Sequence, residues 1–303
     1  MFKNFIEALA RPYITGQARR NLFKAIEAGD IPAVSKILSH HEELIICNDI
    51  LSRNSVWHIA ASKADRELLL VLTTYYQNCV TNSGLLEREH CASWEVYFRR
   101  LVNRRNLDGF TPLLVASSSG NAEATAFFLD AGADPWILDP QSRTPLHCAA
   151  SAGHASCVQV LVRHCGSLTS SSSRRHGVLP YLDAPAGMSQ TALHFAVSFR
   201  HHSCVSLLLG GGANCLLTCD GNYDSGVELG AGTTALHIAA ALGDARSIKL
   251  ILGQYTRGHV SSDPRTAVDI GGRIPLHLAH AMHGPPWLLR LLSPTTSLSA
   301  RGG

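Results

Sequence analysis

The chain has 303 residues, of which 46% are hydrophobic and 16% charged, so the composition indicates a folded protein with a core and excludes global disorder. Lysine and arginine number 26 against 23 acidic residues, and a net charge of +3 gives no reason to expect nucleic acid as the main partner. No apolar run reaches the roughly 18 residues of a membrane span, so no membrane insertion is expected. Nine scattered cysteines favour a reducing compartment over a disulfide framework, and we expect the protein in the cytoplasm, with the nucleus as a second compartment.

A short pattern of the type Thr-Pro-Leu-His recurs along the chain. After a degenerate first copy at Arg20, it begins at Ser55, Thr111, Thr144, Thr191, Thr234 and Ile274. The starts are 35, 56, 33, 47, 43 and 40 residues apart, and each spacing is 33 residues plus an insertion. A 33-residue period with this string is typical of the ankyrin repeat, which the chain resembles over residues 18–293.

The resemblance implies an all-α ankyrin-repeat solenoid of about seven helix pairs joined by short hairpins. Residues 1–17 are then an N-terminal extension, and residues 294–303 a disordered tail. Four insertions interrupt the repeats, at about 77–104, 166–186, 214–231 and 253–267.

The residues of the pattern suit the start of a helix. Threonine is a good N-cap, proline fits the first turn, and a histidine three residues later can reach back to the cap. The structural motif residues are Thr111, Thr144, His147, Thr191, His194, Thr234, His237 and His277. Glycines should end the helices: Gly120, Gly153 and Gly243 the first of a pair, and Gly132, Gly166, Gly211 and Gly253 the second.

The repeated threonine–histidine pairs do not indicate catalysis. A catalytic site needs one constellation in a pocket, whereas these pairs recur with one relative geometry, so we expect no catalytic residue and no cofactor. His201 and His202 with Cys204, or Cys215 with Cys219, are conceivable metal ligands. They lack the Cys-x-x-Cys spacing of zinc sites, and surface histidines with core cysteines are the simpler interpretation, so no metal is expected.

The insertions distinguish this chain from a generic repeat protein. Trp94, Phe98 and Leu101 share helical spacing beside several arginines. One interpretation is a basic, aromatic strip over 94–105 that binds nucleic acid; the favoured one is an extra amphipathic helix packed on the repeats. The serine-rich segment 166–186 is predicted to be a polar loop, and the glycine-rich segment 214–231 to extend the hairpin between the fifth and sixth repeats.

Ankyrin stacks generally bind proteins through two variable zones, the hairpin tips and the exposed side of the first helices. Carried over by position, the candidate partner-binding residues are Phe110, Arg143, Met188, Gln190, Phe199, Arg200, Thr233, Leu242 and Arg273. We hypothesise that Phe199 and Leu242 form an apolar anchor, rimmed by Arg200, Arg143 and Arg273, because apolar anchors with flanking arginines are common hot spots. The alternative is that the two apolar residues pack under the insertions.

Beyond the generic repeat, the chain resembles the ankyrin half of plant ankyrin–RING E3 ubiquitin ligases. The similar strings are Leu-Phe-Lys-Ala-Ile-Glu-Ala-Gly-Asp at 22–30, Cys204-Val205 after a long insertion, and Gly-Arg-Ile-Pro at 272–275. In that family a RING domain follows the repeats, whereas this sequence ends at Gly303 without one, so we expect no enzyme activity from it.

Three functions follow as expectations. The first is a monomeric protein–protein interaction scaffold or adaptor that uses the concave ankyrin surface to bind another protein. The second is the substrate-recognition region of an ankyrin–RING ubiquitin ligase. The third is nucleic-acid binding through residues 94–105.

Overall fold

A computed structural model describes residues 16–48, 52–82, 93–166, 168, 180–221, 229–258, 260 and 262–295. Most of the expected N-terminal extension, the serine tract and most of the expected tail lie outside these ranges. The chain divides into two compact units, an N-terminal unit (Met1–Pro140) and a C-terminal unit (Gln141–Gly303).

The N-terminal unit holds the first three helix pairs. Residues 16–28 are helical and pair with α2 (Ile31–His40), which the short 3₁₀ helix η1 (Glu42–Ile46) follows. The other helices of this unit are α3 (Val56–Lys63), α4 (Arg66–Asn82), α6 (Trp94–Val102), α7 (Pro112–Ser119) and α8 (Ala122–Asp130). Helix α3 packs against α7, and α4 packs against α8, so consecutive pairs bury their apolar faces on each other.

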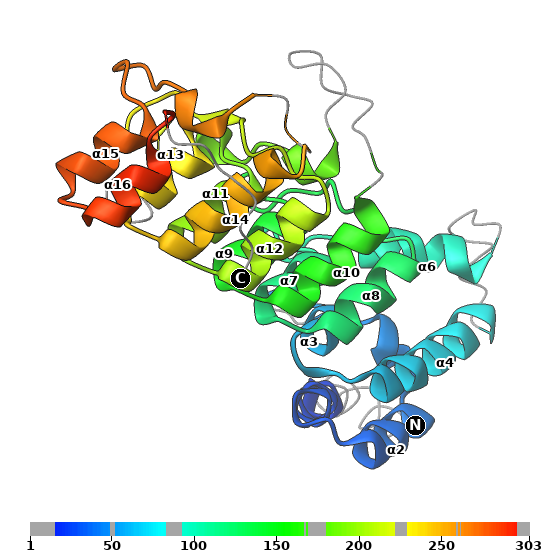
Figure 1. The fold of residues 1–303 in the computed structure, drawn as a ribbon. Coiled ribbons are helices and arrows are strands. Elements are labelled where there is room, and N and C mark those ends of the chain that lie inside the picture. The colour runs from blue at the N-terminus through cyan, green and yellow to red at the C-terminus, as the bar shows by residue number, and fades with distance from the viewer. Residues whose placement is uncertain are drawn as a thin grey trace, which may run out of the picture. The chain divides into compact units, whose positions relative to one another are not determined.

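The C-terminal unit holds repeats 4 to 7, each a first and a second helix (Figure 1). The first helices, α9, α11, α13 and α15, lie side by side, as do the second helices α10, α12 and α14. In chain order the helices are α9 (Pro145–Ala152), α10 (Ala155–Cys165), α11 (Ala192–Ser198), α12 (His202–Gly210), α13 (Ala235–Ala241), α14 (Ala245–Thr256), α15 (Pro275–Ala281) and α16 (Pro286–Leu292). The connections contain the 3₁₀ helices η2 (Tyr181–Asp183), η3 (Gly187–Ser189) and η4 (Pro264–Thr266).

Helix ends follow the sequence signals with one exception. Gly120 and Gly153 cap α7 and α9 in the left-handed conformation, with φ of 80° and 78°. The prediction that Gly253 ends the sixth repeat's second helix is wrong, because α14 continues to Thr256 and Gly253 lies inside it. Glycine permits a left-handed backbone without requiring it, and here Gly258, with φ of 75°, adopts that conformation instead.

The first insertion contributes to the core of the N-terminal unit. Phe98 of α6 is 4% exposed, and its ring centroid lies 4.7 Å from that of Trp57 and 5.0 Å from that of Tyr76. Helix α6 contacts α4, so the favoured interpretation, an extra amphipathic helix packed on the repeats, is confirmed. The enclosed Phe98 ring is not available to stack on a base, whereas Trp94 in the same segment is only half-buried.

The third insertion extends a hairpin, as predicted. Strand β1 (Thr218–Cys219) pairs antiparallel with β2 (Thr233–Thr234), which places Thr218 opposite Thr234 and Cys219 opposite Thr233. This small ribbon lies between the fifth and sixth repeats.

We predict that Leu146→Ala lowers the free energy of unfolding by about 2–5 kcal/mol, because Leu146 of α9 is fully buried between helices and its truncation leaves a cavity. Val268→Ala, at a side chain that is 58% exposed in the same unit, should change it by less than about 0.5 kcal/mol. Chemical denaturation followed by far-UV circular dichroism measures both, and equal effects would contradict the assignment of Leu146 to the core.

Candidate protein-binding surface

The motif histidines hold the start of each first helix. The backbone N–H of the cap residue donates to Nδ1 of the histidine three positions on, at 3.2 Å for Ser55–His58, 3.2 Å for Thr144–His147 and 3.2 Å for Thr234–His237. The same bond is 3.1 Å long at Thr191–His194. In the seventh repeat Ile274 has no hydroxyl, and only the backbone bond to His277 remains, at 3.4 Å.

In three of the motif histidines, the other ring nitrogen bonds to the next hairpin tip. Nε2 of His58 lies 3.0 Å from the carbonyl oxygen of Phe110. Nε2 of His147 lies 3.1 Å from that of Gln190, and Nε2 of His237 lies 3.0 Å from that of Arg273. Since Nδ1 accepts the cap N–H, Nε2 carries the proton and donates to the carbonyl. These three histidines therefore position the hairpin tips of the repeats that follow them, whereas Nε2 of His194 makes no such bond among the described residues.

Burial keeps these rings neutral. It lowers the pKa of His58 and that of His194 to about 4, and it also lowers the pKa of His237. A neutral ring whose two nitrogens are both bonded, as in His58, His147 and His237, offers no lone pair to a metal or a substrate.

The other candidate metal ligands are also engaged or buried. His201 donates from Nε2 to the carbonyl oxygen of Ser151, and His202 Nε2 lies 2.9 Å from a carboxylate oxygen of Asp244. Burial raises the pKa of the Cys204 and Cys215 thiols to about 11, so both stay protonated. In the ranges that the structure describes, no three histidine, cysteine or acidic side chains gather in a way that could hold a metal ion.

The predicted partner-binding residues fall into three groups. Met188, Phe199, Arg200 and Arg273 are exposed, and Phe110, Arg143 and Leu242 are half-buried. Gln190 and Thr233 are buried, and their side chains donate to the carbonyl oxygens of Gly221 and Gly230. Both residues lie at hairpin tips, as expected, but their buried side chains form hydrogen bonds within the protein and are not accessible to a partner.

The hypothesised apolar anchor is assembled only in part. Nη2 of Arg200 donates to the carbonyl oxygen of Leu242 at 2.7 Å, so the ends of α11 and α13 lie side by side. The structure places Arg143 and Arg273 elsewhere, at the starts of α9 and α15. Their position within the repeat explains this. Arg143 and Arg273 precede the motif at the start of a first helix, whereas Phe199 and Leu242 lie at the other end of a first helix of seven or eight residues.

The tips of repeats 5 to 7 form a continuous surface, which we call the tip surface (Met188, Asp220, Val268, Ile270 and Arg273). The amide of Asp220 donates to the carbonyl oxygen of Met188, and the amide of Ile270 donates to that of Ala231. Ile270 is 79% exposed, and Met188 and Val268 are also exposed. Neither Val268 nor Ile270 is among the candidate partner-binding residues predicted from the sequence, although apolar residues in a polar hairpin are a visible signal.

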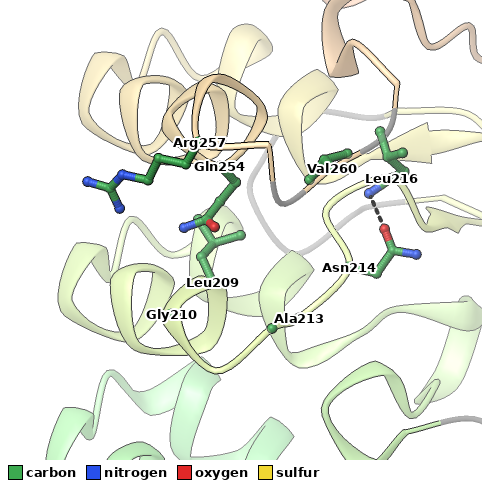
Figure 2. A pocket seen from close by; sticks show the side chains of 9 residues that line it. Leu209, Gly210, Ala213, Asn214, Leu216, Gln254, Arg257 and Val260 are labelled. Carbon is green, nitrogen blue, oxygen red and sulfur yellow. Dashed lines mark hydrogen bonds between the residues drawn. The ribbon is translucent and has the colours of Figure 1, made fainter. Parts of the chain in front are cut away.

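A separate hollow of about 560 Å³ lies between the ends of α12 and α14 (Figure 2). Leu209 of α12 and Gln254 of α14 line it, together with Asn214, Leu216 and Val260. Its described lining residues carry apolar, amide and guanidinium side chains.

Helix pairs with capping histidines, three of which bond to the following hairpin, define a repeat protein built for binding. The family described as Ankyrin repeats (3 copies) matches residues 22–172, 131–218 and 171–263, and the chain belongs to this family. Ankyrin repeats are protein–protein interaction modules, and the chain is such a module. In the part of the chain that the structure describes, every helix is too short or too polar to cross a membrane.

Among curated proteins, the chain is similar to plant proteins named as E3 ubiquitin-protein ligases. It is 32% identical to probable ligase XBOS31 of Oryza sativa subsp. japonica over 143 residues, which are 47% of this chain and 27% of that protein. It is 28% identical to putative ligase XBAT31 of Arabidopsis thaliana over 142 residues, 46% of this chain and 26% of that one. The resemblance predicted from short strings is confirmed, and the match spans about a quarter of each relative's length.

Solved ankyrin domains share the fold. The human ASB11 ankyrin repeat domain superimposes with a TM-score of 0.60 at 19% identity, covering 91% of this chain and 99% of that one. The ankyrin repeat domain of Bcl-3 gives 0.56 at 18% identity, covering 90% and 97%. The all-α ankyrin fold expected from the sequence is confirmed.

We predict that stability falls between pH 6.5 and pH 4 through His58 and His194. Their rings resist protonation in the folded chain but protonate near pH 6.5 when unfolded, so the stabilisation is complete above pH 6.5 and is lost as pH falls toward 4. The difference corresponds to about 3 kcal/mol per ring. Melting temperatures of the wild type and of a His58→Gln/His194→Gln variant, measured from pH 7 to pH 4.5, test this.

Glutamine can still accept the cap N–H but does not titrate, so the variant should lose less stability than the wild type over this range. His280→Gln, at an exposed histidine, is the matched control and should keep the wild-type pH dependence. An unchanged pH dependence in the double variant would show that other groups cause the loss.

Proposed function

We propose that this chain acts as an adaptor that binds another protein through the tip surface, without chemistry of its own. The observation that carries the proposal is the exposure of Met188, Val268 and Ile270 on the two outer tips of the three, each of which is joined to the middle tip by backbone hydrogen bonds. Exposed apolar side chains on a rigid support are the usual anchors of an interface, because little conformational entropy is lost on binding.

Local geometry supports the same surface. Met188 and Ser189 both have positive φ, 58° and 56°, which non-glycine residues rarely adopt. Such backbone conformations persist where the surrounding structure holds them, and they occur more often at binding sites. Arg273 lies three residues from Ile270, and Asp269 holds its guanidinium at 2.8 Å, so a cation flanks the apolar side chain.

We also propose that the protein works as a monomer in the cytoplasm, with the nucleus as a second compartment. Buried cysteines with protonated thiols, such as Cys204 and Cys215, are compatible with a reducing environment.

We predict that Met188→Ser combined with Ile270→Ser reduces capture of the partner protein by about tenfold or more, because both apolar anchors are lost. Tagged wild-type and variant chains would capture proteins from the source cells, with quantification by mass spectrometry. Leu70→Ser, at an exposed leucine of α4, is the matched control and should capture as the wild type does. Equal capture by all three chains, with unchanged circular dichroism, would rule out the tip surface.

A second candidate is supported by the two plant relatives. We propose as the alternative that the chain is the substrate-recognition part of an ankyrin-type ubiquitin ligase, because both relatives are named as E3 ligases. The repeats would then hold the substrate, and a RING domain would transfer ubiquitin.

The mass of the endogenous protein separates the two candidates. The ligase candidate predicts a mass clearly above 32.6 kDa, peptides that map beyond Gly303, and ubiquitin transfer to a captured protein by the longer product. A mass of 32.6 kDa would instead support an adaptor that acts without a RING of its own.

A further inference from the structure

The turns between first and second helices form an edge of the C-terminal unit, which we call the turn edge (residues 152–155, 199–202, 242–246 and 282–287). The bonds of His147 and His237 tie the starts of α9 to α11 and of α13 to α15, and bonds from His201 to Ser151 and from Arg200 to Leu242 tie the ends of α9 to α11 and of α11 to α13. Neighbouring first helices are therefore parallel, and their turns lie in a row. The tips lie at the other ends of these helices, so the turn edge and the tip surface are distinct.

An apolar row runs along this edge. The position that precedes the glycine site is occupied in successive repeats by Ala152, Phe199, Leu242 and Met282. Phe199 is 41% exposed and Met282 is 52% exposed, while Leu242 is half-buried. Trp287, at the start of α16 in the last turn, is also 52% exposed. Large apolar side chains gathered on one edge mark an interaction site more often than a random surface.

The charge along the edge has one sign. Asp244 is the only acidic residue in the four turns; it is buried, accepts from the amides of Arg246 and Ser247, and lies 2.9 Å from His202 Nε2. Burial would raise the pKa of Asp244, but the bonds from Ser247 and His202 outweigh it and lower that pKa. The Asp244 carboxylate is thus satisfied internally.

Two exposed guanidinium groups, of Arg200 and Arg246, remain on the edge. Among the described residues, Arg200 bonds through its side chain only to the Leu242 carbonyl, and neither arginine has a carboxylate partner. The C-terminal unit as a whole is also positively charged, since residues 141–303 contain 12 lysines and arginines against 7 acidic residues.

Arg200 has a strained backbone. It has φ of 58° at the position where the neighbouring repeats have Gly153 and Gly243, with φ of 78° and 64°, and His283 has φ of 55° at the same position of the last repeat. A non-glycine residue is unfavourable in this conformation, so the strain is offset elsewhere or serves a site. Arg200 lies between Phe199 and His201, whose rings stack with centroids 6.2 Å apart.

We propose that the turn edge binds an acidic, amphipathic peptide segment of a partner protein. Apolar side chains of the segment would contact the row formed by Phe199, Leu242 and Met282, and its carboxylates would pair with Arg200 and Arg246. This inference rests on the proposed function, because it adds a second surface and a partner chemistry to a protein-binding chain. A peptide fits better than a nucleic acid, which needs more than two cations and gains little from aliphatic side chains.

The spacing of the row defines the probe. Packed helices lie about 8–10 Å apart, and a polyproline II chain rises about 3.1 Å per residue with three residues per turn, so apolar residues at every third position share one face and match the row. The probe is a fluorescein-labelled Leu-Glu-Glu repeat peptide. A peptide of the same composition with all leucines grouped at one end tests the spacing, and a Leu-Lys-Lys repeat tests the sign of charge.

Binding to the full chain would be measured by fluorescence anisotropy. We expect the Leu-Glu-Glu peptide to bind more tightly than either control peptide, and more weakly at high salt. Phe199→Ser combined with Met282→Ser, and separately Arg200→Glu, should each weaken binding by about tenfold or more. Arg257→Glu, at an exposed arginine of the same unit outside the turn edge, should have a much smaller effect.

Arg200→Gly keeps the test valid if Arg200→Glu fails to fold, because glycine is the residue that neighbouring repeats use at this position. It should retain the fold and lose binding. Equal binding of the grouped-leucine or lysine peptide, or full binding by Arg200→Gly, would overturn the proposal. Displacement of the probe by single-stranded RNA would instead indicate a nucleic-acid surface, and a dimer in light scattering that Phe199→Ser disrupts would indicate a second copy of the chain.

The outcome is separable from that of the proposed function. Met188→Ser combined with Ile270→Ser should leave binding of the Leu-Glu-Glu peptide unchanged. If that variant abolishes partner capture while the peptide does not bind the wild type, the turn-edge inference fails and the adaptor function stands. If the peptide binds the turn edge and capture is unaffected by the tip variant, the proposed tip surface fails instead.

Discussion

The bond pair of the motif histidine organises most of this structure. On one side of the ring, Nδ1 accepts the N–H that begins its own helix, and on the other side, Nε2 donates to the carbonyl of the next hairpin tip. The His147 side chain thus caps its own helix and also bonds to Gln190, which lies 43 residues further along the chain. Because this arrangement satisfies buried backbone groups that would otherwise lack partners, repeats of unequal spacing share one geometry. It also explains why His58, His147 and His237 are not a catalytic set: both ring nitrogens of each are in use.

The first and third insertions each have a described structure, and each is stabilised in its own way. The segment before the third repeat folds into α6 and places Phe98 among Trp57 and Tyr76, so it adds core to the N-terminal unit. The segment before the sixth repeat pairs as β1 and β2 and continues the hairpin. Both absorb extra residues between repeats, where only the ends of the insertion are constrained by the histidine bonds.

The C-terminal unit presents two distinct surfaces as a consequence of its parallel first helices. Hairpin tips gather at the starts of these helices, with Met188 and Ile270 exposed, and the turns gather at their ends, with Phe199 and Met282 exposed. The two differ in electrostatics: Asp269 holds Arg273 at the tips, whereas Arg200 at the turns has no carboxylate partner among the described residues. One module can therefore contact a partner at two places, and two moderate contacts combine into tighter binding when their spacing matches.

From the sequence alone, the period, the helix pairs, the caps and the family could be predicted, because these depend on local signals such as Thr144, His147 and Gly153 that act within one repeat. The placement of side chains required the tertiary structure. Gln190 and Thr233 lie at predicted tips, yet their side chains turn inward, because backbone carbonyls of adjoining loops need donors. Arg143 and Arg273 belong to the opposite end of the first helices from Phe199, and Gly253 continues a helix that Gly258 ends. The sequence by itself therefore determined the repeat and its spacing, while packing between repeats decided which side chains face solvent, since that choice depends on neighbours 30 to 50 residues away in the chain.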